Sequence, residues 1–464
     1  MITIVRGEDN KIYNMPVALK PFLHSELILS NPAYEELIKY GRWVGKTPRR
    51  LTLMKEYQDY ISIPRGFFEN FVEMLDSVAE RYEIIDERKD FPALEVGIEV
   101  TLRTTQQPAV KDMLKSTNGI LIAPPGAGKT VAALYVAAKL GQPTLWITHT
   151  TRLFDQVIDR AISFLDVDFE SIGRIVGSNI QLKPFLNIAM IQSMHRKQLA
   201  QFGNKFGLVI LDECHHCPAS IFMNIVNYFN AKYVYGLTAT AYRRDRMEPF
   251  LFQAIGKKLA TISREELIRA GEITVPILKQ VYTDIPFDYS DVYSRLIGSI
   301  VHNEKRNTLI ASLILQEVVD KENFIMGLST REGHAQLIYE TLKSCGAPVE
   351  IATGKTSTKK NKEAVDNFVE GRARILISTY QYIGEGYDNS KINRLFLMTP
   401  IGIKGKALLV QAFGRAQRSF GSKQSVVYDF IDDCTLLEVQ ARARVNNLKE
   451  EWGSALKIEK GGRN

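Results

Sequence analysis

The chain has 464 residues, of which 45% are hydrophobic and 24% are charged, and this composition excludes a largely disordered or fibrous protein. No apolar run approaches the roughly 18 residues of a membrane span, and four cysteines are too few for a disulfide framework. We therefore expect a cytoplasmic protein, in the host cytoplasm if it is viral, with no membrane partner. The net charge of +7 is only a weak indication of a polyanionic partner.

Residues 1–95 predict a small α+β domain. Met1–Val5 and Lys11–Met15 are typical of a hairpin, Leu51–Ile63 can hold one or two strands, and Phe67–Tyr82 has the periodicity of an amphipathic helix. Early charged residues argue against a signal peptide.

A group of basic residues lies in the middle of this domain, at Arg42, Lys46, Arg49, Arg50 and Lys55. Such a group is most often a solvated face. A phosphate-contacting patch is the alternative interpretation.

From about residue 118 onward, short β-branched or aliphatic runs alternate with longer amphipathic stretches. This alternation predicts βαβ units on parallel sheets. The expected strands are Gly119–Ala123, Thr144–Thr148, Leu208–Asp212, Tyr233–Leu237, Phe324–Leu328, Val349–Ala352, Arg374–Ser378 and Arg394–Met398. We therefore predict an α/β protein with two parallel-sheet lobes in tandem, at residues 96–282 and 283–450. A linker is expected near Ile273–Asp291, and a basic tail at residues 451–464.

Residues 119–130 combine a strand, a glycine loop and the start of a helix that continues over Val131–Leu140. Glycines let the backbone N–H groups approach a polyphosphate, so the pattern is typical of an ATP site. Lys129 would contact the β- and γ-phosphates, and the Thr130 hydroxyl would hold Mg²⁺. Ala123 replaces the usual first glycine of the motif. The loop backbone around the phosphates would come from Pro125, Gly126, Ala127 and Gly128.

Two acidic residues, Asp212 and Glu213, directly follow the apolar run Leu208–Leu211. A carboxylate at the carboxyl end of a parallel strand lies at the edge where such sheets bind ligands. We therefore predict that Asp212 coordinates Mg²⁺ and that Glu213 polarises the attacking water.

Cys214 and Cys217 have a spacing that would also suit a zinc site. Cys345 and Cys434 are isolated, however, so buried thiols are the preferred interpretation.

Further short motifs occur in a fixed order between Leu102 and Arg418. They are Leu102–Gln106, Thr148–Arg152, Ile191–Ser193, Thr238–Thr240, Leu328–Arg331, Thr353–Gly354, Ser378–Thr379, Gly384–Asp388 and Gln411–Arg418. Together with the phosphate loop and Asp212-Glu213, this set resembles the superfamily 2 helicases and translocases. The resemblance implies two RecA-like lobes that use ATP and Mg²⁺.

The resemblance also implies roles for residues outside the phosphate loop. Gln106, with Arg103 beside it, would recognise adenine. Gln411, Arg415 and Arg418 would act in hydrolysis together with the nucleotide-binding Asp388, and Thr238 and Thr240 would couple hydrolysis to movement. The nucleic-acid contacts would be Thr150, Arg152, Gln192, Ser193, Thr330, Arg331, Thr353 and Thr379. These side chains suit phosphate and sugar contacts, so we expect binding that is largely independent of sequence.

The motif Asp-Glu-Cys-His and the segment Ile61–Gly66 are similar to those of XPB- and UvsW-like DNA helicases, which also have a small N-terminal domain. This similarity implies an ATP-dependent DNA helicase or translocase that acts on single-stranded, forked or four-way-junction DNA in replication, recombination or repair. Residues 1–95 would be a DNA-binding accessory module or only a packing partner, and other replication or recombination proteins would be further partners. The alternatives are an RNA helicase and an ATP-gated DNA-binding clamp that separates no strands.

Overall fold

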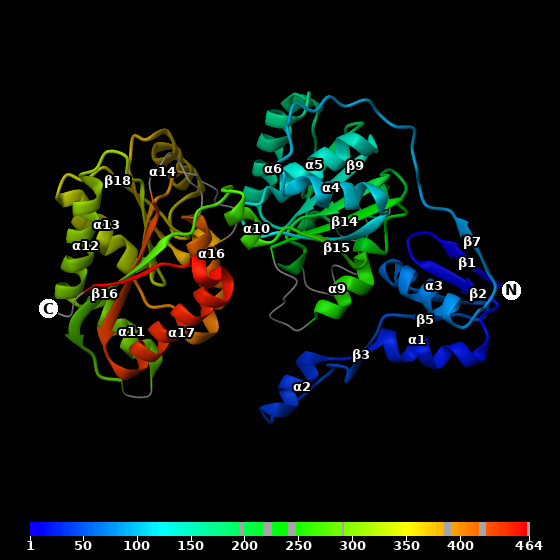
Figure 1. Ribbon diagram of the computed structural model, residues 1–464, viewed down its shortest axis with the longest axis horizontal. Coiled ribbons are helices and arrows are strands. Elements are labelled where there is room, and N and C mark those ends of the chain that lie inside the picture. Colours follow the sequence, from blue (N-terminus) through cyan, green and yellow to red (C-terminus); the bar gives the residue numbers. More distant parts are fainter. Residues whose placement is uncertain are drawn as a thin grey trace. The chain divides into compact units, whose positions relative to one another are not determined.

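The computed structural model describes residues 1–194, 199, 201–216, 225–239, 247–289, 292–384, 391–416 and 424–461. The chain divides into two compact units, Met1–Ser263 and Arg264–Asn464 (Figure 1). Within the described ranges, no helix is long and apolar enough to cross a membrane.

The first unit begins with a five-stranded sheet in the order β5-β6-β2-β1-β7. Its strands are β1 (Ile2–Arg6), β2 (Asn10–Tyr13), β5 (Lys55–Glu56), β6 (Tyr60–Ile63) and β7 (Tyr82–Asp86). The predicted hairpin is β1 with β2, which pair antiparallel. The predicted helix is α3 (Phe68–Ser77), which buries Phe68, Phe71 and Leu75 at helical spacing against this sheet. α1 (Lys20–Leu27) completes the layer with Leu23 and Leu27.

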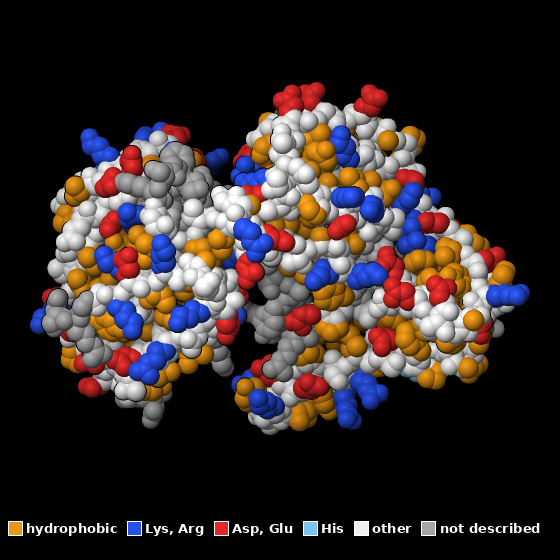
Figure 2. Space-filling view, in the orientation of Figure 1, with side chains coloured by type: hydrophobic (Ala, Val, Ile, Leu, Met, Phe, Trp, Pro, Cys, Tyr) orange, Lys and Arg blue, Asp and Glu red, His pale blue; other side chains and the backbone are white. Residues whose placement is uncertain are grey.

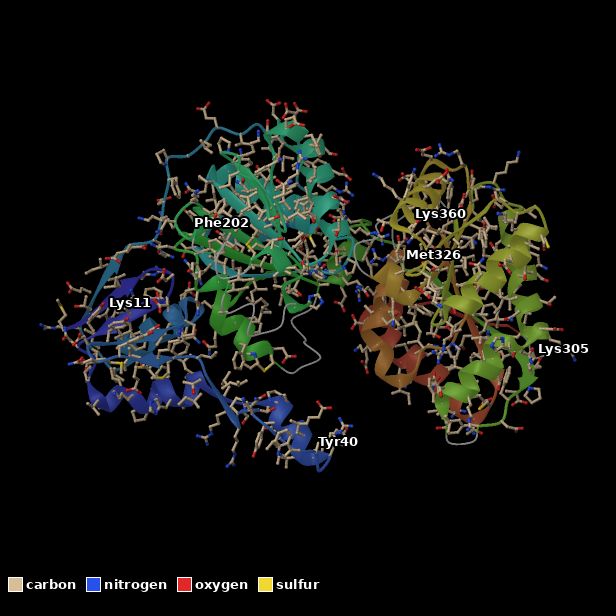
Figure 3. The ribbon with its side chains drawn as sticks, turned by 180° about the vertical axis from the view of Figure 1, so that it is seen from behind. Lys11, Tyr40, Phe202, Lys305, Met326 and Lys360 are labelled. Carbon is tan, nitrogen blue, oxygen red and sulfur yellow. The ribbon has the colours of Figure 1, made fainter. Side chains whose placement is uncertain are left out.

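Residues 28–52 form an arm that extends from this sheet. The arm contains the antiparallel strands β3 (Ile28–Ser30) and β4 (Arg50–Thr52), joined through α2 (Pro32–Lys39). α2 buries none of its residues, and Tyr40 lies at the far end of the arm (Figure 3).

The segment Ile61–Gly66 joins the N-terminal sheet to the larger sheet of the same unit. The Arg65 side chain is buried and donates hydrogen bonds to the carbonyl oxygens of Phe229 (3.3 Å) and Ala231 (2.6 Å). A Cβ on Gly66 would lie only 2.5 Å from the carbonyl oxygen of Phe252, so only glycine fits there. Packing of the two layers therefore accounts for this motif.

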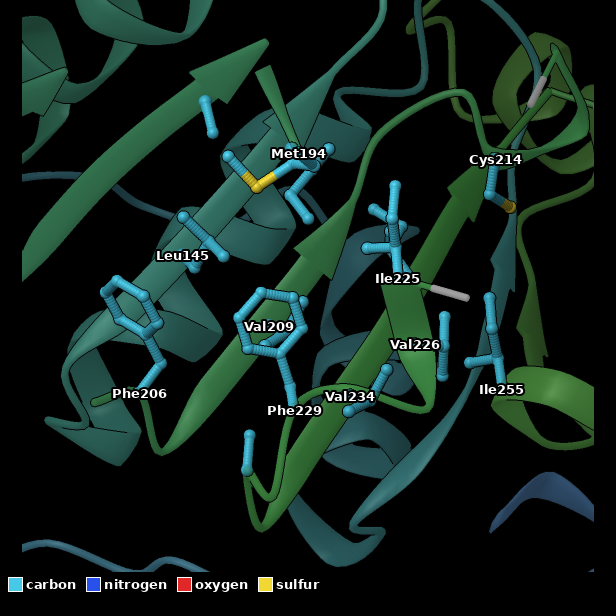
Figure 4. Close-up of a cluster of buried hydrophobic side chains, with 14 of the residues drawn as sticks. Leu145, Met194, Phe206, Val209, Cys214, Ile225, Val226, Phe229, Val234 and Ile255 are labelled. Carbon is cyan, nitrogen blue, oxygen red and sulfur yellow. The ribbon is translucent and has the colours of Figure 1, made fainter. Parts of the chain in front are cut away.

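The larger sheet of the first unit has eight strands, in the order β11-β10-β12-β9-β13-β14-β8-β15. They are β8 (Asn118–Ile122), β9 (Thr144–Thr148), β10 (Gly173–Val176), β11 (Asn179–Gln181), β12 (Leu186–Met190), β13 (Leu208–Leu211), β14 (Tyr233–Thr238) and β15 (Lys258–Thr261). Only β11 is antiparallel to its neighbour among these strands. The helices are α4 (Gln106–Lys115), α5 (Lys129–Leu140), α6 (Thr151–Phe164) and α9 (Glu248–Ile255). Leu145, Val209 and Val234 from adjacent strands pack in one apolar cluster (Figure 4).

The second unit contains a seven-stranded sheet, all parallel, in the order β18-β19-β17-β20-β21-β16-β22. Its strands are β16 (Ile277–Pro286), β17 (Ile325–Ser329), β18 (Val349–Ala352), β19 (Ile375–Thr379), β20 (Arg394–Leu397), β21 (Val426–Asp433) and β22 (Ile458–Lys460). Its helices are α10 (Arg264–Arg269), α11 (Tyr293–His302), α12 (Glu304–Val318), α13 (Glu332–Ser344), α14 (Thr358–Glu370), α15 (Tyr380–Gly384), α16 (Lys406–Arg415) and α17 (Thr435–Trp452). The predicted α/β class with two tandem parallel sheets is confirmed.

Two predicted boundaries are wrong. The expected linker Ile273–Asp291 contains β16, which lies between β21 and β22 and buries Leu278 and Gln280. Pro286 is the last residue of that strand, where a missing N–H is tolerated. The expected basic tail contains β22, which pairs with Leu278–Gln280. The second unit therefore begins at Arg264 and not near residue 283.

Candidate nucleotide and nucleic-acid site

The phosphate loop connects β8 to α5, and two of its glycines adopt left-handed conformations. Gly126 has a φ of +90° and Gly128 a φ of +75°. A Cβ on Gly128 would lie 2.3 Å from Nε2 of Gln106, so neither the backbone nor the space admits another residue. The loop ends at the N-terminus of α5, where unsatisfied N–H groups favour a bound phosphate.

Gln106 is buried at the start of α4 and holds the phosphate loop. Its Nε2 donates to the carbonyl oxygen of Ala127 at 3.0 Å, and its Oε1 accepts from the backbone N–H of Arg103 at 3.0 Å. The Arg103 guanidinium donates to the carbonyl oxygen of Gly126 at 3.2 Å. Both residues are thus placed at the loop. Adenine recognition by Gln106 stays a prediction, and it would require the amide to exchange its present partners.

The two predicted carboxylates follow β13, and one of them meets the loop lysine. Lys129 Nζ lies 3.1 Å from Glu213 Oε1, with side-chain exposures of 10% and 22%. Glu213 has a φ of +45°, and its backbone N–H donates to Asp212 Oδ1 at 2.9 Å. This sharp turn after the strand brings the predicted phosphate-binding lysine and the predicted catalytic glutamate together.

Asp212 is buried, and its ionised form is therefore disfavoured. Burial and the neighbouring Glu213 carboxylate raise the pKa of Asp212 to about 7, although Lys129 acts in the opposite direction. A buried carboxylate whose charge is undercompensated suits a cation. Together with the Thr130 hydroxyl at the start of α5, it offers the oxygen ligands that Mg²⁺ prefers. The residues present fit the predicted metal.

A further contact, which was not predicted from the sequence, links Glu213 to the end of β14. His215 Nδ1 lies 3.4 Å from Glu213 Oε2 and 2.9 Å from the hydroxyl oxygen of Thr238. His215 thus connects the carboxylate motif to one predicted coupling residue. Its place as the last residue of the Asp-Glu-Cys-His motif was the signal available in the sequence. Thr240 lies outside the described residues.

The zinc interpretation involves only one described cysteine of the pair. Cys214 is buried in the apolar cluster of the first unit (Figure 4), as the buried-thiol interpretation predicted. Cys217 lies outside the described residues.

The four predicted nucleic-acid contacts of the first unit differ in exposure. Gln192 is exposed, and its amide donates to the carbonyl oxygen of His149 at 2.9 Å. Thr150 caps α6 by accepting from the N–H of Leu153 at 3.3 Å, and Arg152 is half-buried in that helix. Ser193 is buried, and its hydroxyl accepts from the N–H of Gly177 at 2.7 Å. As folded, the Ser193 side chain supports the turn between β10 and β11.

The four counterparts in the second unit follow three adjacent parallel strands, β17, β18 and β19. Their carboxyl ends lie at one edge of the sheet, as the motif order predicts. Thr330 and Arg331 are exposed after β17. Thr353 and Thr379 are buried, and the Thr379 hydroxyl accepts from the N–H of Tyr382 at 3.3 Å.

Among the predicted residues of the last motif, Gln411 and Arg415 lie on α16 and are half-buried. Their spacing of four residues places them on one face of the helix. Arg418 and Asp388 lie outside the described residues.

The fold and this site define a phosphate-loop nucleotide-binding protein built on two parallel α/β sheets. Residues 99–243 match the family "Type III restriction enzyme, res subunit", and residues 304–420 match the "Helicase conserved C-terminal domain". The two matches together span more than half of the sequence. The chain belongs to the superfamily 2 helicases, an ATP-dependent helicase family, as its motifs predicted.

Named relatives include both RNA and DNA enzymes. The chain is 27% identical to "Putative ATP-dependent RNA helicase L396" of Acanthamoeba polyphaga mimivirus, over 86% of this chain and 76% of the relative. It is also 27% identical to "DNA 3'-5' translocase XPB2" of Sulfurisphaera tokodaii, over 84% of this chain and 92% of the relative. Among solved structures, Dbp5 of S. cerevisiae bound to RNA and ADP BeF3 has a TM-score of 0.57 at 15% identity, over 77% of this chain and 89% of Dbp5. This last similarity concerns the fold.

Proposed function

We propose that this chain is an ATP-dependent DNA helicase or translocase that unwinds or branch-migrates forked and four-way-junction DNA in replication, recombination or repair. The main support is the similarity to a DNA 3'-5' translocase along 92% of that relative's length. The docked segment Ile61–Gly66 adds support, since its sequence resembles that of XPB- and UvsW-like DNA helicases and it makes the N-terminal sheet part of the first unit.

Hydrolysis would begin with an exchange of partners at Lys129. The β- and γ-phosphates of ATP bear more negative charge than a carboxylate, so they would displace Glu213 from the ammonium. Glu213 would then accept a proton from the attacking water. Mg²⁺, when bound by Thr130 and Asp212, would neutralise charge on the phosphate oxygens. The roles of Gln411, Arg415, Arg418 and Asp388 in hydrolysis belong to the same proposal.

The coupling of hydrolysis to movement would pass through His215. This ring contacts both Glu213 and Thr238, so a change in the charge facing Glu213 would alter its bond to the end of β14. Thr238 and Thr240 are the proposed coupling residues. The exposed side chains of Gln192, Thr330 and Arg331 are the proposed contacts to the nucleic-acid backbone.

An RNA helicase is the second candidate function, favoured by the similarity to a named RNA helicase over 86% of this chain. The two hypotheses share the same ATP site and differ in the nucleic acid that stimulates it.

Steady-state ATP hydrolysis with single-stranded DNA, duplex DNA, a four-way DNA junction and RNA tests the proposal, with Lys129→Ala as the blank. We expect DNA to stimulate turnover and the junction to stimulate it most. Stimulation by RNA alone would support the second candidate. A strand-displacement assay on the junction then separates a helicase from a DNA-binding clamp, which would displace no strand. If none of the nucleic acids changes the rate of ATP hydrolysis, both candidate functions are contradicted.

A further inference from the structure

The arm at residues 28–52 is held in place with little apolar burial. Several of the hydrogen bonds within the arm are made by Asn31. Its side-chain Oδ1 accepts from the N–H of Ala33 and so caps α2. Its Nδ2 donates to the carbonyl oxygen of Pro48 at 2.7 Å. The backbone N–H of Asn31 also donates to the carbonyl oxygen of Arg49. A buried asparagine therefore ties the start of α2 to Pro48 and Arg49 at the end of the loop that follows this helix, although the loop itself is largely exposed.

Two aromatic side chains of this loop lie in solvent. Trp43 is 89% exposed and Tyr40 is 56% exposed, whereas the other two tryptophans, Trp146 and Trp452, are buried. The Trp43 indole rests on Gly45, where a Cβ would lie 3.1 Å from the ring and where φ is +51°. Gly45 thus supports the ring and leaves most of it uncovered. An indole this exposed leaves apolar area in contact with water that a bound ligand would cover.

The same loop is strongly basic. Residues 39–50 contain no acidic residue and five basic ones, Lys39, Arg42, Lys46, Arg49 and Arg50. None of these five forms an ion pair with any residue that the structure describes. The nearest carboxylates of the arm, Glu35 and Glu36, are on α2. In Figure 2, blue and orange side chains lie together over this arm at the lower edge of the view.

An exposed indole among cations that form no ion pair with the described residues suits unpaired nucleotides. Each nucleotide offers a flat base that can stack on the indole and a phosphate that the cations can contact. A polyanion fits better than a protein of mixed surface charge, because residues 39–50 contain five basic residues and no acidic one. We propose that the arm binds single-stranded nucleic acid, with one base stacked on Trp43 and the adjacent phosphates contacted by Arg42, Lys46, Arg49 and Arg50. This inference rests on the proposed function, and it names an additional contact outside the helicase motifs.

Intrinsic fluorescence tests the stacking, because Trp43 is the one exposed tryptophan of the three. We expect oligothymidylate to quench the wild-type emission, a blunt DNA duplex to quench it far less, and Trp43→Phe to abolish the quenching. Trp43→Ala should weaken oligothymidylate binding roughly tenfold, and Trp43→Phe should retain most of the affinity. Phe169→Ala, which removes another exposed aromatic side chain of the first unit, is the matched control and should leave the affinity unchanged.

Salt dependence tests the phosphate contacts. In the double variant Arg49→Ser/Arg50→Ser, the slope of log Kd against log salt should fall by about 0.7 for each lost contact. Turnover of ATP without nucleic acid should be unchanged in all the arm variants, which shows that they are folded.

The outcomes separate the two proposals. If wild-type turnover responds to no nucleic acid, the proposed function fails. If it responds but oligothymidylate does not quench the wild-type emission and binds wild type and Trp43→Ala with the same affinity, the arm does not bind nucleic acid and this inference is overturned.

Discussion

Glu213 has an uncommon backbone conformation for a residue with a side chain. Its φ of +45° lies in the left-handed region, which costs a non-glycine residue about 1–3 kcal/mol. The contacts that hold it there are the Lys129 ion pair and the His215 ring on the two oxygens of its carboxylate. Backbone strain at a site of this kind indicates that the geometry of the turn matters for the proposed hydrolysis more than for stability.

At this scale, Thr238→Val tests the link through His215. Valine has nearly the shape of threonine, so the change removes one hydrogen bond at a cost of about 1 kcal/mol. We expect basal ATP turnover to remain within a few-fold and its stimulation by nucleic acid to fall. Thr144→Val is the matched control, because Thr144 is also a buried strand residue whose hydroxyl bonds a nearby carbonyl oxygen. Equal loss of stimulation in both variants would contradict a specific role for Thr238.

Asp212 makes stability depend on pH in an uncommon direction. Its pKa in the folded chain is raised to about 7 from 3.8, so folding favours the protonated carboxyl. The stabilising contribution is complete below about pH 4 and is lost as the pH rises to 7. With a chelator present to remove Mg²⁺, titration of Asp212 should lower the free energy of unfolding as the pH rises from 4 to 7. We expect this fall to be at most about 1.4 kcal/mol per pH unit.

Urea unfolding of wild type and Asp212→Asn at several pH values measures this contribution. The free energy of unfolding should fall less between pH 4 and 7 in the variant than in wild type. Mg²⁺ should make the two pH profiles more alike, because the cation competes with the proton for the Asp212 carboxylate. Parallel pH profiles would show that Asp212 keeps an ordinary pKa.

At the scale of elements, the contact between the N-terminal sheet and the larger sheet of the first unit depends on a few residues. Among the described side chains, the Arg65 guanidinium is the one from the N-terminal sheet layer that donates to the carbonyl oxygens of Phe229 and Ala231. Burial lowers its pKa to about 9, and this shift reflects the cost of placing a cation there.

Arg65→Met should therefore be strongly destabilising. It leaves two buried carbonyl groups without their donor, for which we expect a loss of about 3 kcal/mol. The loss should be concentrated at the contact between layers, so limited proteolysis should release residues 1–95 sooner. Arg81→Met, an exposed position of the same layer, is the control and should behave as wild type. A variant as resistant as wild type would show that the other contacts, among them the ion pairs of Lys257 with Glu69 and Glu73, are enough to hold the layers together.

At the scale of the whole molecule, the boundary between the units decides which pieces can fold. β16 lies between β21 and β22 and contributes Leu278 to an apolar cluster of the second unit. A fragment that begins at residue 283 would lack Ile277–Tyr282, the part of β16 that pairs with β22 and with most of β21. β22 would then have no partner, and β21 would be an open edge.

We expect a fragment of residues 264–464 to unfold cooperatively on heating and one of residues 283–464 to be unfolded or aggregated. Circular dichroism during thermal melting is the measurement, with the full-length chain for reference. Equal melting of both fragments would show that β16 is dispensable for the second core.

Local sequence patterns were enough to predict the parts of this protein that depend on neighbouring residues. The phosphate loop, the acidic pair after β13 and the buried strands β9 and β19 follow from local patterns of glycine, charge and apolar runs. Those patterns act through backbone freedom and strand burial within a few residues, so no knowledge of distant contacts was needed.

Features that depend on pairing between distant parts of the chain could be established only from the folded protein. β16 and β22 become strands because each completes a sheet, although their sequences are typical of a linker and a tail. Ser193 and Thr353 are covered, the Trp43 indole is left in solvent, and His215 meets Thr238 from another strand. Burial and hydrogen-bond partners are set by residues far away in the sequence, and for that reason local patterns could not predict them.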